Sequence, residues 1–173
     1  KDRSASFLMR LFASPLKSAD FILGYTLPLI FVSLAQVIIT VLASTAFGFA
    51  LSETVFFGIL VAVFNSLLFI GLGLLFGSIL NEKAVGGICG ALITNLAGFL
   101  SGIFIPLDLV GGAFQTTAEI LPFYHSVQSI KAALAGDFGA AFPHASVVLA
   151  YTAVIYLLAI VIFRKQMKGK RVG

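Results

Sequence analysis

Four long stretches of this sequence hold no Asp, Glu, Lys or Arg. They cover residues 25–52, 54–81, 84–107 and 142–163. About 20 apolar residues suffice to cross the hydrocarbon core of a bilayer as an α-helix. We therefore expect an all-α helix bundle with four membrane-spanning helices, over residues 21–51, 54–80, 84–107 and 142–163.

A fifth apolar stretch lies between the last two expected spans, over residues 109–134. Glu119, Pro122 and Lys131 interrupt it, and proline breaks a helix because it lacks a backbone donor. We expect residues 108–139 to form two short helical pieces that dip partway into the membrane and return. Irregular backbone at that depth must be buried in protein or face a water-filled cavity. This re-entrant segment is therefore a candidate outer gate, with the residues Pro106, Asp108, Glu119 and Pro122.

The distribution of Lys and Arg gives the orientation of the four expected spans. With an even number of crossings, both ends of the chain lie on the same side of the membrane. Ten of the eleven Lys and Arg residues then fall on that side, and Lys131 alone falls on the other. The ten are Lys1, Arg3, Arg10, Lys17, Lys83, Arg164, Lys165, Lys168, Lys170 and Arg171. Cytoplasmic loops hold the excess of positive residues, so we expect both ends, and a basic tail over residues 164–173, to be cytoplasmic.

The composition agrees with a membrane protein. Apolar residues make up 60% of the 173 residues and charged residues 10%, whereas a soluble domain has roughly a quarter charged. The mean hydropathy of +1.09 points to the lipid bilayer as the solvent. The net charge is +4, but the basic residues are not interleaved with aromatic residues, as a nucleic-acid surface requires. We expect one membrane domain over residues 1–173 and no nucleic-acid partner.

Residues 1–17 have the pattern of an amphipathic helix at the membrane surface. One helical face holds Phe7, Leu8, Leu11 and Phe12, with Arg3, Ser6 and Arg10 opposite, and Pro15 ends the helix. The helix is either a simple surface anchor or a docking element for a cytoplasmic partner. Because the chain opens without a methionine inside this pattern, we also expect it to be a piece of a longer polypeptide.

Polar side chains recur along one face of the first expected span. They are Ser33, Gln36, Thr40 and Ser44, at spacings of three and four residues. The Gln36 amide needs a partner, because an unpaired amide in hydrocarbon costs several kcal/mol. It either bonds a neighbouring helix or faces a hydrated substrate path. The same two alternatives apply to Asn65 and Asn95 in the second and third spans.

The third expected span carries a ridge of small residues. It consists of Gly86, Gly90, Thr94, Gly98 and Gly102, with Gly87 and Ala91 beside it. Small residues let helix backbones approach closely, and the second span offers a shorter counterpart in Gly73 and Gly77. We expect either tight packing of these two spans or a smooth interface along which helices slide.

The sequence lacks the motifs of the common catalytic sites. It holds no Gly-x-x-x-x-Gly-Lys-Ser/Thr phosphate cradle, no His-Glu-x-x-His zinc pair and no Gly-x-Ser-x-Gly elbow. His125 and His144 are expected to make ordinary hydrogen bonds at the interface, and no metal site is expected. Apart from Cys89 and tyrosines, the spans contain no ionisable acid or base, which argues against a proton or sodium relay.

In order along the chain, several short motifs resemble the permease subunits of type-2 ABC exporters. A coupling segment ends in a Ser-Pro step at Ser14-Pro15, and Leu23-Gly24 follows at the first span. Gly71-Leu72-Gly73 lies in the next span, before a short turn at Asn81-Glu82-Lys83. The run Ser101 to Pro106 then leaves the third span, and Leu121 to His125 matches the outer segment. Family members usually have six spans, so the resemblance implies that the first two are absent here.

The resemblance implies a transport subunit without an ATPase of its own. Its partners would be an ABC ATPase subunit, which binds ATP and magnesium, and a second permease copy or paralogue. It would lie in a bacterial inner or plasma membrane. Contact with the ATPase would come from Phe7, Leu8, Arg10, Leu11, Phe12 and Pro15, with Asn81, Glu82 and Lys83 forming the second cytoplasmic turn. The alternative is a non-transporting membrane scaffold or immunity-type helix bundle.

Overall fold

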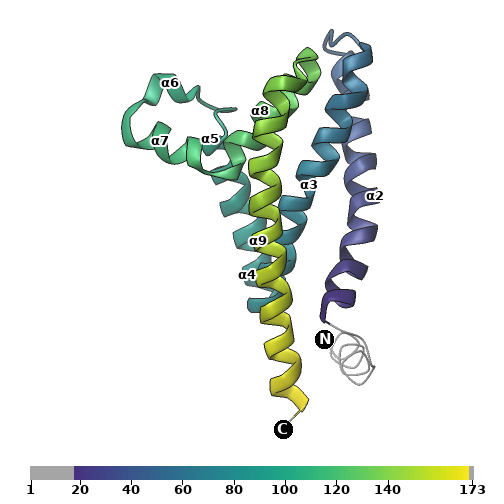
Figure 1. The fold of residues 1–173 in the computed structure, drawn as a ribbon, viewed down its shortest axis with the longest axis vertical. Helices are drawn as coiled ribbons and strands as arrows, with labels where there is room; N and C mark the ends of the chain where they lie inside the picture. Colours follow the sequence, from purple (N-terminus) through teal and green to yellow (C-terminus); the bar gives the residue numbers. More distant parts are fainter. Residues whose placement is uncertain (1–17, 172–173) are drawn as a thin grey trace.

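The computed structural model describes residues 18–171, and all the regular structure in this part of the chain is helical (Figure 1). The helices are α2 (Ser18–Thr45), α3 (Glu53–Ile79), α4 (Glu82–Val85), the π-helix η1 (Gly86–Ile93), α5 (Thr94–Leu100), α6 (Leu107–Val110), α7 (Gly112–Ile120), α8 (Pro122–Ala135) and α9 (Phe138–Arg171). The expected all-α fold class is confirmed.

Four helical stretches are long and apolar enough to cross a membrane: Ser18–Thr45, Glu53–Ile79, Lys83–Leu100 and Phe138–Lys165. Figure 1 shows that α2 begins and α9 ends at the same end of the bundle, which we call the proximal end. The turn between α2 and α3 and the turn between α8 and α9 lie at the other end, the distal end. The described parts of the chain thus have the even number of crossings that the sequence predicts.

The spans end at different residues from those expected. The first ends at Thr45, six residues before the expected residue 51, and a turn containing Gly48 follows it. The third ends at Leu100 because the chain turns at Gly102, whose φ of +76° suits glycine. The fourth begins at Phe138, four residues before the expected residue 142, because the Asp137 carboxylate accepts the Ala140 N–H at 2.9 Å and caps it.

The distal segment between the third and fourth spans contains three helices, α6, α7 and α8, where two were expected. α8 starts with Pro122 at its first position and ends at Gly136, whose left-handed φ of +78° closes the helix. Its far end is tied to α3, since the Thr54 hydroxyl donates to the Leu134 carbonyl at 2.7 Å.

A buried amide joins α3 to the beginning of α8. Asn65 is 2% exposed, and its Nδ2 donates to the Ser126 carbonyl at 3.0 Å and to Ser129 Oγ at 2.9 Å. Asn65 lies eleven residues beyond Thr54, which is about 16 Å along a helix. α8 therefore runs beside the distal half of α3, at the depth of the spans.

α9 packs against α3 through a close approach at Gly71. A Cβ atom placed on Gly71 would lie 2.7 Å from Cε2 of Tyr156 and 3.1 Å from Cγ2 of Ile155. Further along, Leu68 and Val148 are fully buried, and Ile22, Ala159 and Phe163 form a second cluster nearer the proximal end. The Phe21 and Phe163 rings stack there at 4.2 Å between centroids, which joins α2 to α9.

The expected packing of third-span glycines against the second span is wrong within this chain. Cβ atoms added to Gly73, Gly77, Gly86, Gly87 and Gly90 would meet no atom of the described residues within 4 Å. In the third span, the glycines at positions 86, 87 and 90 belong to the π-helix η1, and the hydroxyl of Thr94, the first residue of α5, donates to the Cys89 carbonyl of η1 at 3.1 Å. The glycines leave an open face on the bundle instead of an internal seam.

Large apolar side chains cover the outside of the described bundle. Phe31, Ile39 and Leu157 are each more than 60% exposed, and similar side chains are exposed on every span. Soluble monomers rarely expose such continuous apolar surface. Lipid is the solvent that these surfaces fit, as the composition indicates.

The Gly71 contact gives a stability prediction with a matched control. We expect Gly71→Leu to lower the thermal unfolding midpoint of the detergent-purified protein, because overpacking a helix contact costs about 1–3 kcal/mol. Gly24→Leu makes the same change on α2, where an added Cβ would meet no described atom within 4 Å, and we expect no decrease. Equal midpoints for the two variants would contradict the packing of α9 on α3.

Candidate functional site

The structure places three of the four groups of candidate residues that the sequence suggests. These are the polar residues of the spans, the turn at Asn81, and the distal segment. The expected coupling residues Phe7, Leu8, Arg10, Leu11, Phe12 and Pro15 lie outside the described residues.

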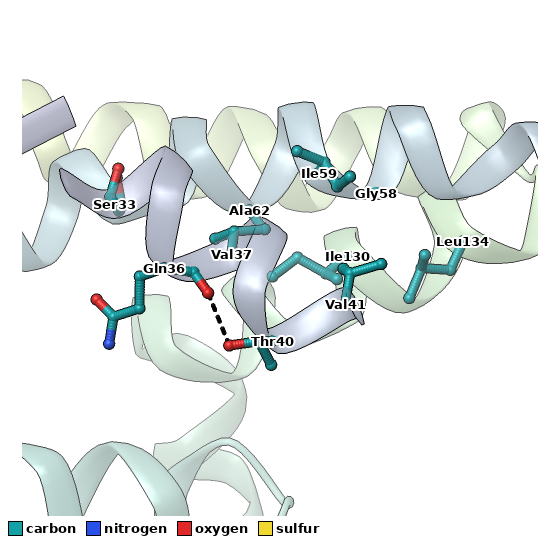
Figure 2. A pocket seen from close by; sticks show the side chains of 11 residues that line it. Ser33, Gln36, Val37, Thr40, Val41, Gly58, Ile59, Ala62, Ile130 and Leu134 are labelled. Carbon is teal, nitrogen blue, oxygen red and sulfur yellow. Dashed lines mark hydrogen bonds between the residues drawn. The ribbon is translucent and has the colours of Figure 1, made fainter. Parts of the chain in front are cut away.

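A cavity of about 400 Å³ lies between α2, α3 and α8 (Figure 2). Its walls are apolar apart from a few hydroxyls and one amide. The lining residues are Ser33, Gln36, Val37, Thr40 and Val41 of α2, Gly58, Ile59, Ala62 and Ser66 of α3, and Ile130 and Leu134 of α8. The structure thus brings two of the expected path residues, Gln36 and Thr40, to one cavity.

The polar groups of this cavity differ in how well they are bonded. The hydroxyls of Ser33 and Ser66 lie 2.9 Å apart and connect α2 to α3. The Thr40 hydroxyl donates to the Gln36 carbonyl at 2.8 Å. The side-chain amide of Gln36 is exposed, and Figure 2 shows it directed away from α3. Among residues 18–171 no hydrogen bond to this amide is present, so it is open to water, a ligand or another chain.

The other expected path residues lie elsewhere. Asn65 lies outside the cavity, and its amide donates a hydrogen bond to α8. Ser44 donates to the Val41 carbonyl at 2.7 Å, and Asn95 donates to the Ala91 carbonyl at 2.8 Å, each within its own helix. Sequence reasoning missed the partners of two polar residues: Ser66 bonds Ser33, and both Ser126 and Ser129 bond Asn65. Serine is common in helices, and Ser126 contributes its backbone carbonyl here, so only the tertiary contacts single these residues out.

The turn after α3 lies toward the proximal end. Asn81 caps the next helix, since its Oδ1 accepts the Ala84 N–H at 2.9 Å. The helix that Asn81 caps is α4, and Lys83 is exposed in it. α4 continues directly into η1. An exposed, capped turn at this end of the bundle is accessible to a partner protein.

The distal segment brings together the two acidic residues expected at the gate. Gln115 Nε2 donates to Asp108 Oδ1 at 3.3 Å and to Glu119 Oε1 at 2.8 Å. Both carboxylates line a cavity of about 210 Å³, with Pro106 and Lys131 also in its wall. Pro122 is buried at the start of α8 and does not line this cavity.

The two histidines, nineteen residues apart in sequence, meet between α8 and α9. Their Nδ1 atoms are 2.7 Å apart, so one ring donates and the other, neutral, accepts. Within the described part of the chain, no group of three or more His, Cys, Asp or Glu side chains could hold a metal ion. The histidine pair is thus a contact between two helices of the bundle.

The fold and these sites define a polytopic helical membrane protein, with a mainly apolar cavity among its spans and a small charged cavity in the distal segment. Residues 2–135 match the family model of the ABC-2 type transporter. The match covers most of the chain, and the chain belongs to this family. It is a permease component of an ABC transporter, which is the membrane part of such a system and not its ATPase.

The family match includes α2, α3, the third span and the distal segment as far as the end of α8. Neither the curated proteins nor the solved structures that were searched gave a match.

The unbonded Gln36 amide gives a test of whether its cavity holds water. In a Cys89→Ala background, we expect Gln36→Cys to react with a charged thiol reagent about tenfold faster than Ile38→Cys, because the reactive thiolate forms only in water. Ile38 lies two residues along α2, at nearly the same depth, and about 200° around the helix. Equal labelling rates would contradict a hydrated cavity at Gln36.

Proposed function

We propose that this chain is the transmembrane permease subunit of an ATP-driven exporter, which forms the substrate pathway and couples to a separate ATPase subunit. Membership of the ABC-2 type transporter family over residues 2–135 carries the proposal. The sequence has no phosphate cradle of its own, so ATP and magnesium would bind the partner.

The ATPase would dock at the proximal end of the bundle. The amphipathic pattern of residues 1–17 immediately precedes α2, and the exposed turn at Asn81 and Lys83 lies toward the same end. The proposed orientation has this end in the cytoplasm of a bacterial cell, because the order of the spans along the sequence assigns ten of the eleven Lys and Arg residues to this side. ATP is available on that side of the membrane.

The transported molecule would pass along surfaces that the single chain leaves open. The Gln36 cavity supplies an amide without a partner among the described residues, in otherwise apolar walls. The glycine face around η1 leaves added Cβ atoms without any described neighbour within 4 Å, so it would accommodate a second permease copy or a paralogue. ATP binding would then shift two such permeases between inward-facing and outward-facing arrangements by favouring one of them.

The docking role of the N-terminal segment predicts a clear difference between two Phe→Asp substitutions in the full-length protein. We expect Phe12→Asp to abolish co-purification of the ATPase and to lower substrate-stimulated ATP hydrolysis at least about tenfold, because a carboxylate in an apolar contact costs several kcal/mol. Phe47→Asp is the control. Phe47 is 93% exposed in the turn at the distal end, so docking and hydrolysis should be unchanged.

Retention of the ATPase by the Phe12→Asp variant would overturn the coupling role of this segment. Purification of the unaltered protein without any ATPase would instead favour a non-transporting scaffold.

A further inference from the structure

Two cavities of different character lie on either side of the turn that ends the third span. One, of about 400 Å³, is bounded by α3, α5, α8 and the loop after α5. Its walls are mainly apolar, with Phe69, Ala97, Phe104, Phe123 and Val127 among them. The other is the 210 Å³ cavity that contains Asp108, Glu119 and Lys131. We call them the apolar cavity and the charged cavity.

The two cavities are neighbours. Ser101 lines both of them and is 3% exposed, with its hydroxyl donating to the Gly98 carbonyl at 3.1 Å. α8 also contributes to both: Phe123 and Val127 line the apolar cavity, and Tyr124 and Gln128 line the charged one. A molecule that extends past the turn at Ser101 would therefore have one part among charges and another among apolar side chains.

The charged cavity holds groups of both signs that are not paired with each other. Gln115 fixes the two carboxylates by donating to both. Lys131 forms no ion pair with either carboxylate, although all three side chains line the same small cavity and all three belong to the described residues. The cavity can thus accept a ligand that brings a cation to the carboxylates and an anion to the Lys131 ammonium.

The position of the charged cavity suits the headgroup region of a bilayer. Lys131 lies five residues before the Gly136 turn at the distal end of the bundle, which is about 8 Å along α8. The short helices beside it expose apolar side chains, with Leu109 79% and Ile120 62% exposed. Such a mixture of exposed apolar and charged groups is typical of a segment at the membrane interface.

We propose that the two cavities bind one phospholipid with a primary ammonium group, of the phosphoethanolamine class, from the leaflet at the distal end. Its phosphate contacts Lys131, its ammonium contacts Asp108 and Glu119, and an acyl chain enters the apolar cavity. A primary ammonium fits better than a quaternary one because it donates hydrogen bonds to both carboxylates. This lipid is a resident ligand that braces α6 and α7 against α8, and it is separate from any transported molecule.

The test measures binding of three lipids with identical acyl chains to the purified full chain, by native mass spectrometry in detergent. The headgroups are phosphoethanolamine, phosphocholine and phosphoglycerol. We expect the ethanolamine lipid to bind about tenfold more tightly than the other two, as charge-assisted hydrogen bonds allow. Free phosphoethanolamine lacks acyl chains and should not compete with it. Equal affinities for the three lipids, or competition by the free headgroup at similar concentration, would overturn the proposal.

Variants separate the parts of the site. Asp108→Asn combined with Glu119→Gln should abolish the preference for the ethanolamine lipid, Lys131→Gln should weaken binding of all three lipids, and Ala97→Phe should do the same by filling the apolar cavity. Lys165→Gln, a loss of one positive charge at the other end of the bundle, should change nothing. An unchanged preference in the double variant would also overturn the proposal. The comparison of lipids on the unaltered chain needs no variant, so a variant that fails to fold leaves the test intact.

Discussion

In a bilayer every backbone N–H and C=O within the hydrocarbon must find a partner inside the protein, and this constraint shapes the whole chain. It makes the spans helical, and it restricts each break in a helix to a place where protein surrounds it. At the break after Leu100 the backbone bonds to its own last turn: the Ser101 N–H donates to the Ala97 carbonyl at 3.0 Å and the Phe104 N–H to the Gly98 carbonyl at 3.4 Å. Beyond the break, α8 returns beside α3, where the Asn65 amide and the Thr54 hydroxyl donate to its carbonyl groups. The cavities of the distal segment lie around this returning helix.

The broad fold could be predicted because hydrophobic length is a strong signal, and in the part of the chain that the structure describes four helical stretches are long and apolar enough. The ends of the helices could not, because they depend on local events. A left-handed Gly102 ends the third span early, and an Asp137 cap begins the last span early. The packing predicted from the glycine ridge was wrong for a similar reason. Small residues permit close packing, but whether a neighbouring helix is present is decided by the tertiary arrangement.

Single polar residues of the candidate sites can be recognised in the sequence, but the contacts that bring them together cannot. A polar residue in a span is easily recognised, and both Gln36 and Asn65 stand out. The structure then gives them different surroundings: Asn65 is bonded to α8, and the Gln36 amide is left open beside a cavity. The meeting of His125 with His144, and of Asp108 with Glu119 through Gln115, joins residues from different helices. Apart from the Gln115–Glu119 bond, which has the i, i+4 spacing of a single helix, no spacing rule along the sequence encodes these contacts.

The topology is tested most directly by labelling single cysteines in intact cells with a membrane-impermeant thiol reagent, in the Cys89→Ala background. We expect Phe47→Cys, at the distal end, to be labelled from outside, whereas Lys83→Cys and Lys165→Cys should be labelled only after the cells are permeabilised. Labelling of Lys83→Cys and Lys165→Cys from opposite sides of the membrane would contradict the four-span arrangement and the proposed position of the ATPase with it.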